Sequence, residues 1–394
     1  MRSKRPLIAW LLALVVLAGA CTTRAPARTP APAPTTSDPS PAPSMLKIAF
    51  IEDLAPEDAQ TRTAPAYQGA RLAVDTATLG ERLPVPVEIV ALDTKGDPST
   101  AADVVRTIVD DQSFVGAIGA PLLTGQASIG VAMDAAGLPM ITLSTLGPDL
   151  SRNGWTGWRR AVAGQTREAA VLADHIDGMR RLGAGACLIG DGSPASIGLL
   201  HGVARAISTP VALRMRAAIE RNGSDRVVAA IAAAGCGVVV WGGFGAEGAV
   251  LRQQLVEQGL RSVRFVGGEG LKDPTFLSVV GEAGAGTVVV CPCVDLTTST
   301  RFAAQRFIQD YQSDFGLPPG PYAAEAWDVM RMFLQAIERG AATRSQVAAA
   351  LSATSSFEGL ADTYVFEPSG ELVPSSAQVH VFRDEGGRWI PQTG

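Results

Sequence analysis

One serine of this chain stands where a nucleophile could act. Ser193 lies in Gly192-Ser193-Pro194, directly after a run of strand-forming residues. The segment lacks the second glycine of a G-x-S-x-G elbow, and no histidine stands in an obvious partner position. The sequence also contains no H-E-x-x-H metalloprotease motif. We therefore interpret Ser193 as a loop residue and expect no catalytic site.

The glycines at 242–245 are the second candidate for chemistry. Gly-Gly-Phe-Gly follows another apolar run and loosely resembles a loop that cradles phosphate. It has neither the lysine of a P-loop nor the full G-x-G-x-x-G pattern. We interpret these glycines as a tight turn between a strand and a helix.

Cysteine is used sparingly and could serve structure or metal binding. Apart from Cys21, the chain has Cys187, Cys236, Cys291 and Cys293. Four thiols allow three disulfide connectivities, and the closely spaced 291–293 pair could form only a very small ring. No histidine lies near this Cys-Pro-Cys segment, so a zinc site is the weaker reading. We expect no metal and no cofactor.

The overall charge excludes one class of partner. The net charge is -5 for 394 residues, and charged residues make up only 18% of the chain. Binding to nucleic acid needs a concentrated basic surface, which this composition does not supply.

The first 21 residues have the pattern of a bacterial export signal. Basic residues at positions 2, 4 and 5 precede an apolar run at 7–17, which is too short to span a bilayer comfortably. The small residues 18–20 and Cys21 then resemble the lipobox of bacterial lipoproteins, although Ala18 stands where leucine is usual. The resemblance implies a lipoprotein signal peptide at 1–21, with Cys21 lipidated. A plain secretory signal is the alternative.

Residues 22–45 are rich in Pro, Ala and Thr. This composition favours extended backbone and offers no apolar side chains for a core. We expect a tether between the lipid anchor and a folded body.

From residue 46, short apolar runs alternate with amphipathic stretches of helical length. Predicted strands lie at 47–52, 85–93, 115–119, 139–142, 186–190, 211–216, 237–242, 263–267 and 287–291. Predicted helices lie at 66–78, 100–110, 125–136, 165–181, 197–206, 225–234, 248–258, 302–315 and 322–339. Strands separated by helices imply parallel pairing through right-handed crossovers. Because the pattern runs twice, we predict an α/β protein with two doubly wound parallel-sheet lobes and a hinge.

Four landmarks carry a family resemblance. They are Tyr-Gln-Gly-Ala at 67–70, Asp-Thr-Lys-Gly-Asp-Pro at 93–98, Leu-Pro-Met-Ile at 138–141 with the polar segment after it, and Trp-Gly-Gly-Phe at 241–244 with Phe-Val-Gly-Gly-Glu-Gly at 265–270. In this order and spacing they resemble the leucine/isoleucine/valine-binding proteins, type I periplasmic binding proteins that serve ABC importers. The resemblance runs from about residue 46 to the C-terminus. It implies lobe one at 46–162 and 294–366, and lobe two at 163–293 and 367–394.

The resemblance also implies which residues hold a solute. Family members grip an α-carboxylate with hydroxyls after the third and fourth strands, and Thr124 matches the first of these positions. The second falls at Ser144, Thr145 and Leu146, where strict alignment puts Leu146 in place of a hydroxyl. Backbone N–H groups at helix N-termini assist in binding an anion.

The resemblance implies that lobe two binds the other end of the solute. Glu269 matches the acid that holds the α-ammonium group in the family. Asp191 matches an aspartate after the first strand of lobe two, but Ala195 stands where many members stack a tyrosine. Phe244 replaces a frequent tyrosine, and Tyr322 falls where the late helices approach the cleft.

These features together predict an extracytoplasmic solute-binding lipoprotein at the cell membrane, not an enzyme. It would close two lobes around an amino acid or related small amine, branched-chain amino acids being the family's ligands, and deliver it to an ABC permease. The alternatives are a sensory receptor of the same fold and an exported enzyme.

Overall fold

The computed structural model describes residues 44–54, 59–179, 185–220 and 225–392 of the chain. The predicted signal peptide, Cys21 and residues 22–43 of the predicted tether lie outside these ranges. Within the ranges described, no helix has both the length and the apolar character needed to span a bilayer.

Strands and helices alternate along most of the described chain. The first group is β1 (Leu46–Glu52), α1 (Ala59–Leu79), β2 (Val87–Asp93), α2 (Pro98–Asp110), β3 (Phe114–Gly119), α3 (Gln126–Ala135), β4 (Met140–Thr142), η1 (Leu150–Asn153) and β5 (Trp158–Arg160). The second group is α4 (Gln165–Asp177), β6 (Ala186–Gly190), α5 (Pro194–Ala206), β7 (Val211–Arg216), α6 (Asp225–Ala234), β8 (Val238–Trp241), α7 (Gly245–Glu257), β9 (Arg264–Gly267), η2 (Glu269–Leu271), α8 (Pro274–Val280), η3 (Gly281–Gly284) and β10 (Val288–Cys291). The last group is α9 (Phe302–Phe315), α10 (Ala323–Glu338), α11 (Arg344–Ala353), β11 (Phe357–Glu358), β12 (Thr363–Tyr364), β13 (His380–Asp384) and β14 (Trp389–Gln392).

The described strands form two large sheets. One has five parallel strands in the order β2-β1-β3-β4-β5. The other has seven strands in the order β14-β13-β10-β9-β8-β6-β7, parallel from β10 to β7 and antiparallel at β13 and β14. The predicted α/β class with two doubly wound units is confirmed. The sequence prediction missed β5, a three-residue strand whose Trp-Arg-Arg sequence lacks an apolar run.

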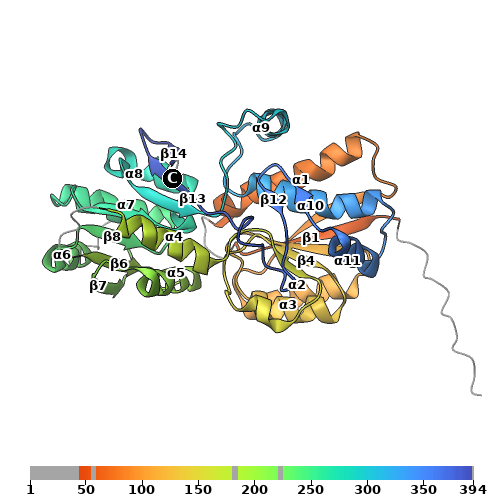
Figure 1. Cartoon of the computed structure of the whole chain (residues 1–394), viewed down its shortest axis with the longest axis horizontal. Helices are drawn as coiled ribbons and strands as arrows, with labels where there is room; N and C mark the ends of the chain where they lie inside the picture. Colours follow the sequence, from red (N-terminus) through yellow and green to blue (C-terminus); the bar gives the residue numbers. More distant parts are fainter. Residues whose placement is uncertain (1–43, 55–58, 180–184, 221–224, 393–394) are drawn as a thin grey trace, which may run out of the picture. The chain divides into compact units, whose positions relative to one another are not determined.

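Alternation of side chains along β1 explains why the first sheet is covered on both faces. Ile48 and Phe50 pack with α1 and α10, whereas Ala49 and Ile51 pack with α2 and α3. Figure 1 shows the corresponding layers, with α1 and α10 on one side of the strands and α2 and α3 on the other. Parallel strands buried on both faces require such continuous apolar runs.

The second sheet is built in the same way. Leu188 of β6 lies in an apolar cluster with α4 and α5, while its neighbour Ile189 faces the cluster that contains α7 and α8. Figure 1 shows these helices around the strands β6, β7 and β8. Both sheets therefore hold their strand ends rigidly, which is what a ligand site at those ends requires.

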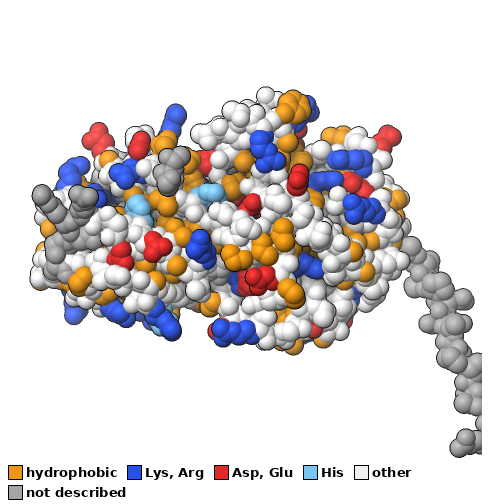
Figure 2. Space-filling view, viewed as in Figure 1, with side chains coloured by type: hydrophobic (Ala, Val, Ile, Leu, Met, Phe, Trp, Pro, Cys, Tyr) orange, Lys and Arg blue, Asp and Glu red, His pale blue; other side chains and the backbone are white. Residues whose placement is uncertain are grey.

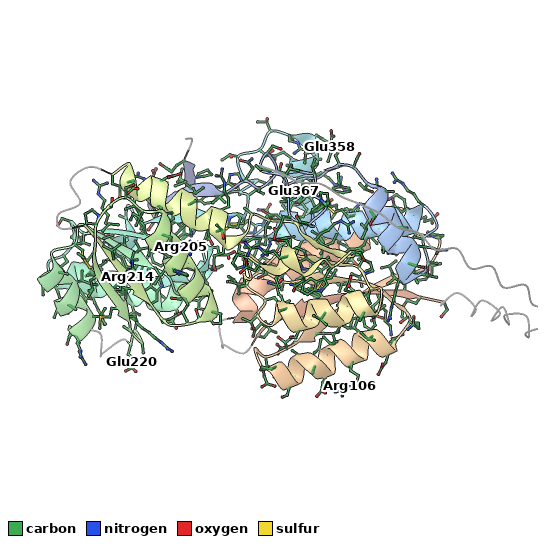
Figure 3. All side chains as sticks on the ribbon, turned by 60° about the horizontal axis from the view of Figure 1, so that its bottom comes forward. Arg106, Arg205, Arg214, Glu220, Glu358 and Glu367 are labelled. Atoms are coloured by element: carbon green, nitrogen blue, oxygen red, sulfur yellow. A yellow bond between two sulfur atoms is a disulfide. The ribbon has the colours of Figure 1, made fainter. Side chains whose placement is uncertain are left out.

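Charged side chains are distributed over the surface without a single dominant sign. On the face shown in Figure 2, lysine and arginine side chains are interspersed with aspartate and glutamate. Arg106 and Glu358, both labelled in Figure 3, are exposed and lie at the periphery of the chain. They provide control positions for the experiments below.

Two disulfides resolve the connectivity that the sequence left open. Cys187 of β6 is bonded to Cys236, which lies two residues before the start of β8, and the two cysteines are 49 residues apart in sequence. Cys291 at the end of β10 is bonded to Cys293, two residues later. All four cysteines are buried. The first bond therefore closes a long loop across the second sheet, whereas the second only fixes a local turn.

We expect the two disulfides to contribute unequally to stability. In the chain-entropy view, a disulfide restricts the unfolded chain more when its loop is longer, with typical values of about 2–4 kcal/mol. The double variant Cys187→Ala/Cys236→Ala should lose about this much free energy of unfolding in urea titrations. The matched variant Cys291→Ala/Cys293→Ala should lose clearly less, and an equal loss would contradict the argument.

Candidate functional site

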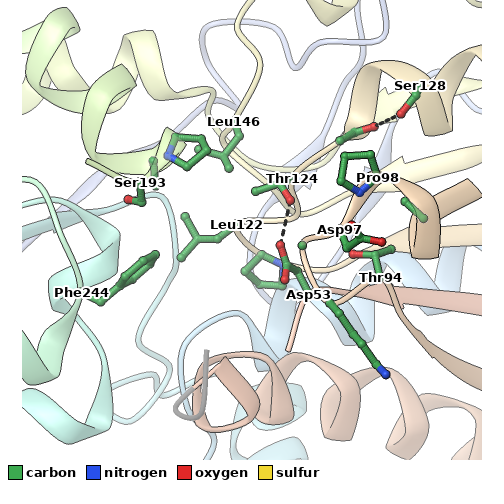
Figure 4. A pocket seen from close by; sticks show the side chains of 17 residues that line it. Asp53, Thr94, Asp97, Pro98, Leu122, Thr124, Ser128, Leu146, Ser193 and Phe244 are labelled. Carbon is green, nitrogen blue, oxygen red and sulfur yellow. Dashed lines mark hydrogen bonds between the residues drawn. The ribbon is translucent and has the colours of Figure 1, made fainter. Parts of the chain in front are cut away.

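A cavity of about 450 Å³ lies where the carboxyl ends of strands from both sheets converge (Figure 4). Its lining on the side of the first sheet comes from the loops after β1, β2, β3 and β4. The lining on the side of the second sheet comes from residues 193–195 after β6 and from Phe244 after β8. Helices α2, α3, α5 and α7 begin beside these loops, so the cavity occupies the usual ligand position of open α/β sheets.

Of the eight residues predicted to bind the solute, three line this cavity: Thr124, Leu146 and Phe244. The other five, Ser144, Thr145, Asp191, Glu269 and Tyr322, do not line it, and all of these except Asp191 are buried. The structure thus brings the predicted residues of both sheets to the same edge. It divides them into a group that lines the cavity and a hydrogen-bonded group that does not.

Thr124 does not present a free hydroxyl to the cavity. Its Oγ1 donates a hydrogen bond of 2.8 Å to Oδ2 of Asp53, which follows β1 and also lines the cavity (Figure 4). The β2–α2 turn approaches the same carboxylate, because a Cβ on Gly96 would lie 3.0 Å from Oδ1 of Asp53. Gly96 also has a φ of +61°, which glycine adopts without strain, so both the space and the backbone favour glycine at this turn.

Strained backbone also marks this side of the site. Lys95 and Leu122 line the cavity with φ values of +54° and +59°. Tyr322 has a φ of +64° at the N-terminus of α10. Positive φ is uncommon for such residues and concentrates at ligand sites in folded proteins.

Glu269 is the centre of the buried group. Its two carboxylate oxygens accept hydrogen bonds from the hydroxyls of Thr145 and Tyr322. Its backbone N–H donates to Oε1 of Glu168, in the first turn of α4, at 2.6 Å. Residues distant in sequence and carried by both sheets' loops therefore meet at one carboxylate.

Burial raises the pKa values of both acids in this group. Desolvation raises the pKa of Glu269 to about 7, although the two hydroxyls and the charge of Arg160 favour its ionised form. Burial and the neighbouring Glu269 raise the pKa of Glu168 well above its ordinary value. Two adjacent carboxyls with little solvent cannot both ionise easily, so a cation brought to this place would be stabilised.

Arg160 holds the loop that carries the second predicted binding segment. Its guanidinium donates to the carbonyl oxygens of Ser144, Leu146 and Gly147 at 2.6–2.8 Å. Nε of Arg160 also pairs with Glu371 at 3.0 Å, and the arginine side chain has no exposed surface. The planar guanidinium thus holds three carbonyl groups and a carboxylate at once, more partners than the three donors of a lysine could serve.

Ser144 has a structural role in this arrangement. Its hydroxyl donates to the carbonyl oxygen of Leu123 at 3.3 Å and accepts the N–H of Leu146 at 3.3 Å. It therefore ties the loop after β3 to the loop after β4.

Asp191 and Ser193 shape the opposite wall. Oδ1 of Asp191 accepts the N–H of Ser193 at 2.8 Å, and Ser193 caps α5 by accepting the N–H of Ser196 at 3.2 Å. The sequence interpretation of Ser193 as a loop residue agrees with this capping role. Among the described residues, no group of three or more His, Cys, Asp or Glu side chains is arranged to hold a metal ion.

Sequence reasoning missed Asp53, Leu122 and Lys95 as lining residues. Each follows a strand of the first sheet at its carboxyl end, and this position was the available signal. Asp53 comes directly after the first predicted strand. Its position beside the ligand site could therefore have been predicted from the fold alone.

Replacing Arg160 tests whether it organises the binding loop. Arg160→Met leaves three buried carbonyls and Glu371 without their donor, and breaking a buried ion pair in this way costs about 3–5 kcal/mol. Urea unfolding should show this loss. The matched Arg106→Met variant removes a pair between exposed side chains, Arg106 and Asp103, and should change stability by less than about 0.5 kcal/mol. Equal effects would show that Arg160 has no special role.

The raised pKa of Glu269 predicts how stability depends on pH. A carboxyl whose pKa is higher in the folded state stabilises the fold below its unfolded pKa and loses that contribution as pH rises. The Glu269 contribution is therefore lost between about pH 4.5 and pH 7. Denaturant titrations from pH 5 to pH 8 should give a shallower decline for Glu269→Gln than for the wild type. The exposed control Glu358→Gln should retain the wild-type slope.

Comparison with known proteins identifies the family. Residues 45–384 match the periplasmic binding protein family. A "Leu/Ile/Val-binding protein homolog 3" from Brucella melitensis is 24% identical over 321 residues, which cover 76% of this chain and 80% of that protein.

Solved structures show the same fold. The branched-chain amino acid transporter substrate-binding protein LivJ from Streptococcus pneumoniae, in complex with isoleucine, aligns with a TM-score of 0.77 at 18% identity, covering 88% of this chain and 100% of that chain. A solute-binding protein of an ABC transporter from R. palustris, in complex with benzoate, aligns with a TM-score of 0.72 at 17% identity, covering 88% and 95%. The predicted family and type I fold are confirmed: this chain belongs to the periplasmic binding proteins, which bind solutes and are not enzymes.

Proposed function

We propose that this protein is the extracytoplasmic solute receptor of an ABC importer, and that its solute is an amino acid or a related small amine. The observation that carries this proposal is the cavity of about 450 Å³ at the strand ends, lined by loops of both sheets. Its size suits a small metabolite. Closure of two lobes on such a site is a common mode of ligand capture.

The buried carboxyl of Glu269 supports the proposal that the solute is an amine. In the proposed complex, the ammonium approaches Glu269, where each carboxylate oxygen accepts one hydroxyl and retains a second lone pair. A cation at this place favours the ionised form of Glu269 and releases its proton. Phe244 and Leu146 supply apolar contact, while Asp191, Ser144 and Tyr322 support the walls.

The backbone at the start of α3 supports the proposal that the solute carries a polar group at the end opposite its ammonium. Gly125 precedes α3 with a φ of +66°, and Thr124 stands directly before it. The N–H groups of a helix N-terminus attract electron-rich groups.

Tethering and delivery complete the proposal. Cys21 carries the lipid, residues 22–45 span the distance to the folded body, and the lobes comprise 46–162 with 294–366 and 163–293 with 367–394. Several acyl chains on one residue provide firm anchoring, at about 0.8 kcal/mol for each buried CH₂. The closed form then presents the solute to a permease.

A thermal-shift screen of amino acids, amides and amines tests the function. A solute at 100 times its Kd should stabilise the protein by about 2.7 kcal/mol, a readily measured shift in Tm. Calorimetry with the solute so identified should then show at least a tenfold loss of affinity for Glu269→Gln, since the ammonium loses its charged partner. The control Glu358→Gln should bind normally. The absence of any stabilising solute contradicts the receptor function, and undiminished binding by Glu269→Gln contradicts the ammonium role.

A further inference from the structure

Helix α10 carries two buried acids on one face, and each holds a different segment of the chain. Glu325 and Asp328 lie three residues apart, a spacing that places both on the same side of a helix. Oε1 of Glu325 accepts the N–H of Val294 at 2.6 Å. Asp328 accepts two N–H groups from the turn between β11 and β12 at 2.7 and 2.8 Å, and the hydroxyl of Tyr364 at 3.0 Å.

The segment held by Glu325 connects the two sheets. Val294 follows β10 of the second sheet and leads into α9, whereas α10 packs with Ile48 and Phe50 of the first sheet. The partners of Asp328 belong instead to a single hairpin. Glu325 therefore fixes the place where the chain leaves the second sheet.

The same connection also supports the turn that carries Glu269. Nζ of Lys272 lies 3.5 Å from Sγ of Cys293, the residue directly before Val294, and both side chains are buried. The backbone N–H of Lys272 donates to the carbonyl oxygen of Glu269 at 2.9 Å. The η2 turn therefore rests on the connection that Glu325 holds.

Tyr322 closes this set of contacts from the start of α10. It stands three residues before Glu325, and its hydroxyl donates to Oε2 of Glu269. Its Oη also lies 3.8 Å from Sγ of Cys291, which is bonded to Cys293. The start of α10, the connection after β10 and the η2 turn thus form a ring of contacts. A displaced connection would change both the backbone and the side-chain contacts of Glu269.

We propose that Glu325 is a positioning residue for Glu269: by holding the connection after β10 against α10, it keeps the η2 turn within reach of the Tyr322 hydroxyl. Glu325 does not line the ligand cavity and acts only through these neighbours. The inference rests on the proposed function, in which Glu269 binds the ammonium of the solute. It follows that the Tyr322–Glu269 hydrogen bond depends on Glu325 and not on Asp328.

The contact of Glu325 with Val294 does not require one particular protonation state. Burial raises the pKa of Glu325 to about 7, while the N–H of Val294 and the charge of Lys272 favour its ionised form. An ionised or a neutral carboxyl both offer an acceptor to an N–H group. The isosteric amide of Glu325→Gln should therefore serve the same purpose, which supplies a conservative variant.

Fluorine NMR of the protein labelled with 3-fluorotyrosine tests the inference without any solute. The chain has four tyrosines, and Tyr322→Phe assigns the signal of Tyr322. In the wild type this signal should move between pH 5 and pH 9, because its hydroxyl is bonded to Glu269, whose pKa is about 7. Burial raises the pKa of Tyr322 itself well above its ordinary value, so its own ionisation does not interfere.

Variants assign the effect to Glu325. In Glu325→Leu the pH-dependent displacement of the Tyr322 signal should fall at least twofold, whereas Glu325→Gln should keep the wild-type displacement. The matched control Asp328→Asn changes the other buried acid of this face, and should alter the Tyr364 signal but not the displacement of Tyr322. A wild-type displacement in Glu325→Leu overturns the inference, as does an equal loss in Asp328→Asn.

A second variant keeps the test decisive should Glu325→Leu fail to fold. Cys291→Ala/Cys293→Ala releases the same connection from its other side, and we expect it to cost little stability. The displacement of the Tyr322 signal should again fall at least twofold, and an unchanged displacement overturns the inference. Because no solute is added, failure here leaves the receptor function intact, and failure of the solute screen contradicts the receptor function alone.

Discussion

A buried carboxylate needs donors to offset its lost hydration, and Glu269 obtains them from segments that are far apart in the chain. Thr145 follows β4 of the first sheet, Tyr322 precedes α10, and the backbone of Glu269 is held by Glu168 of α4. Uncompensated, this charge would be strongly destabilising. The loops after β4 and β9 and the start of α10 must therefore keep their positions together, and the loop after β4 also lines the cavity through Leu146.

Arg160 extends this constraint into the first sheet. Its guanidinium fixes three carbonyl groups on either side of Thr145, and its charge also favours the ionised form of Glu269. The missed strand β5 is what places Arg160 there. A short strand with two arginines looks unlike a core element, but its second arginine is fully buried because the loop supplies acceptors.

The sequence predicted the features that depend on local interactions. It did not predict the contacts between residues that are far apart in the chain. The strands at 186–190 and 211–216 and the helix at 302–315 have the bounds expected from the sequence, because local apolar patterns determine them. The site could be placed at the carboxyl ends of the strands for the same reason. Its hydrogen bonds could not be predicted, since Thr124 lies 71 residues from Asp53 and Glu269 lies 124 residues from Thr145. The identification of Thr124 as a ligand residue rests on resemblance alone and remains a prediction.

The central claim is that a small amine occupies the cavity lined by Leu146 and Phe244, and that its ammonium reaches the buried carboxylate of Glu269. A crystal structure of the protein with the solute that stabilises it most tests this directly. The account predicts density for the solute in this cavity, with a nitrogen within hydrogen-bonding distance of Glu269 and its apolar body against Phe244 and Leu146. Density in the separate cavity of about 300 Å³ beside Trp389, with the site at Glu269 unchanged, would contradict it.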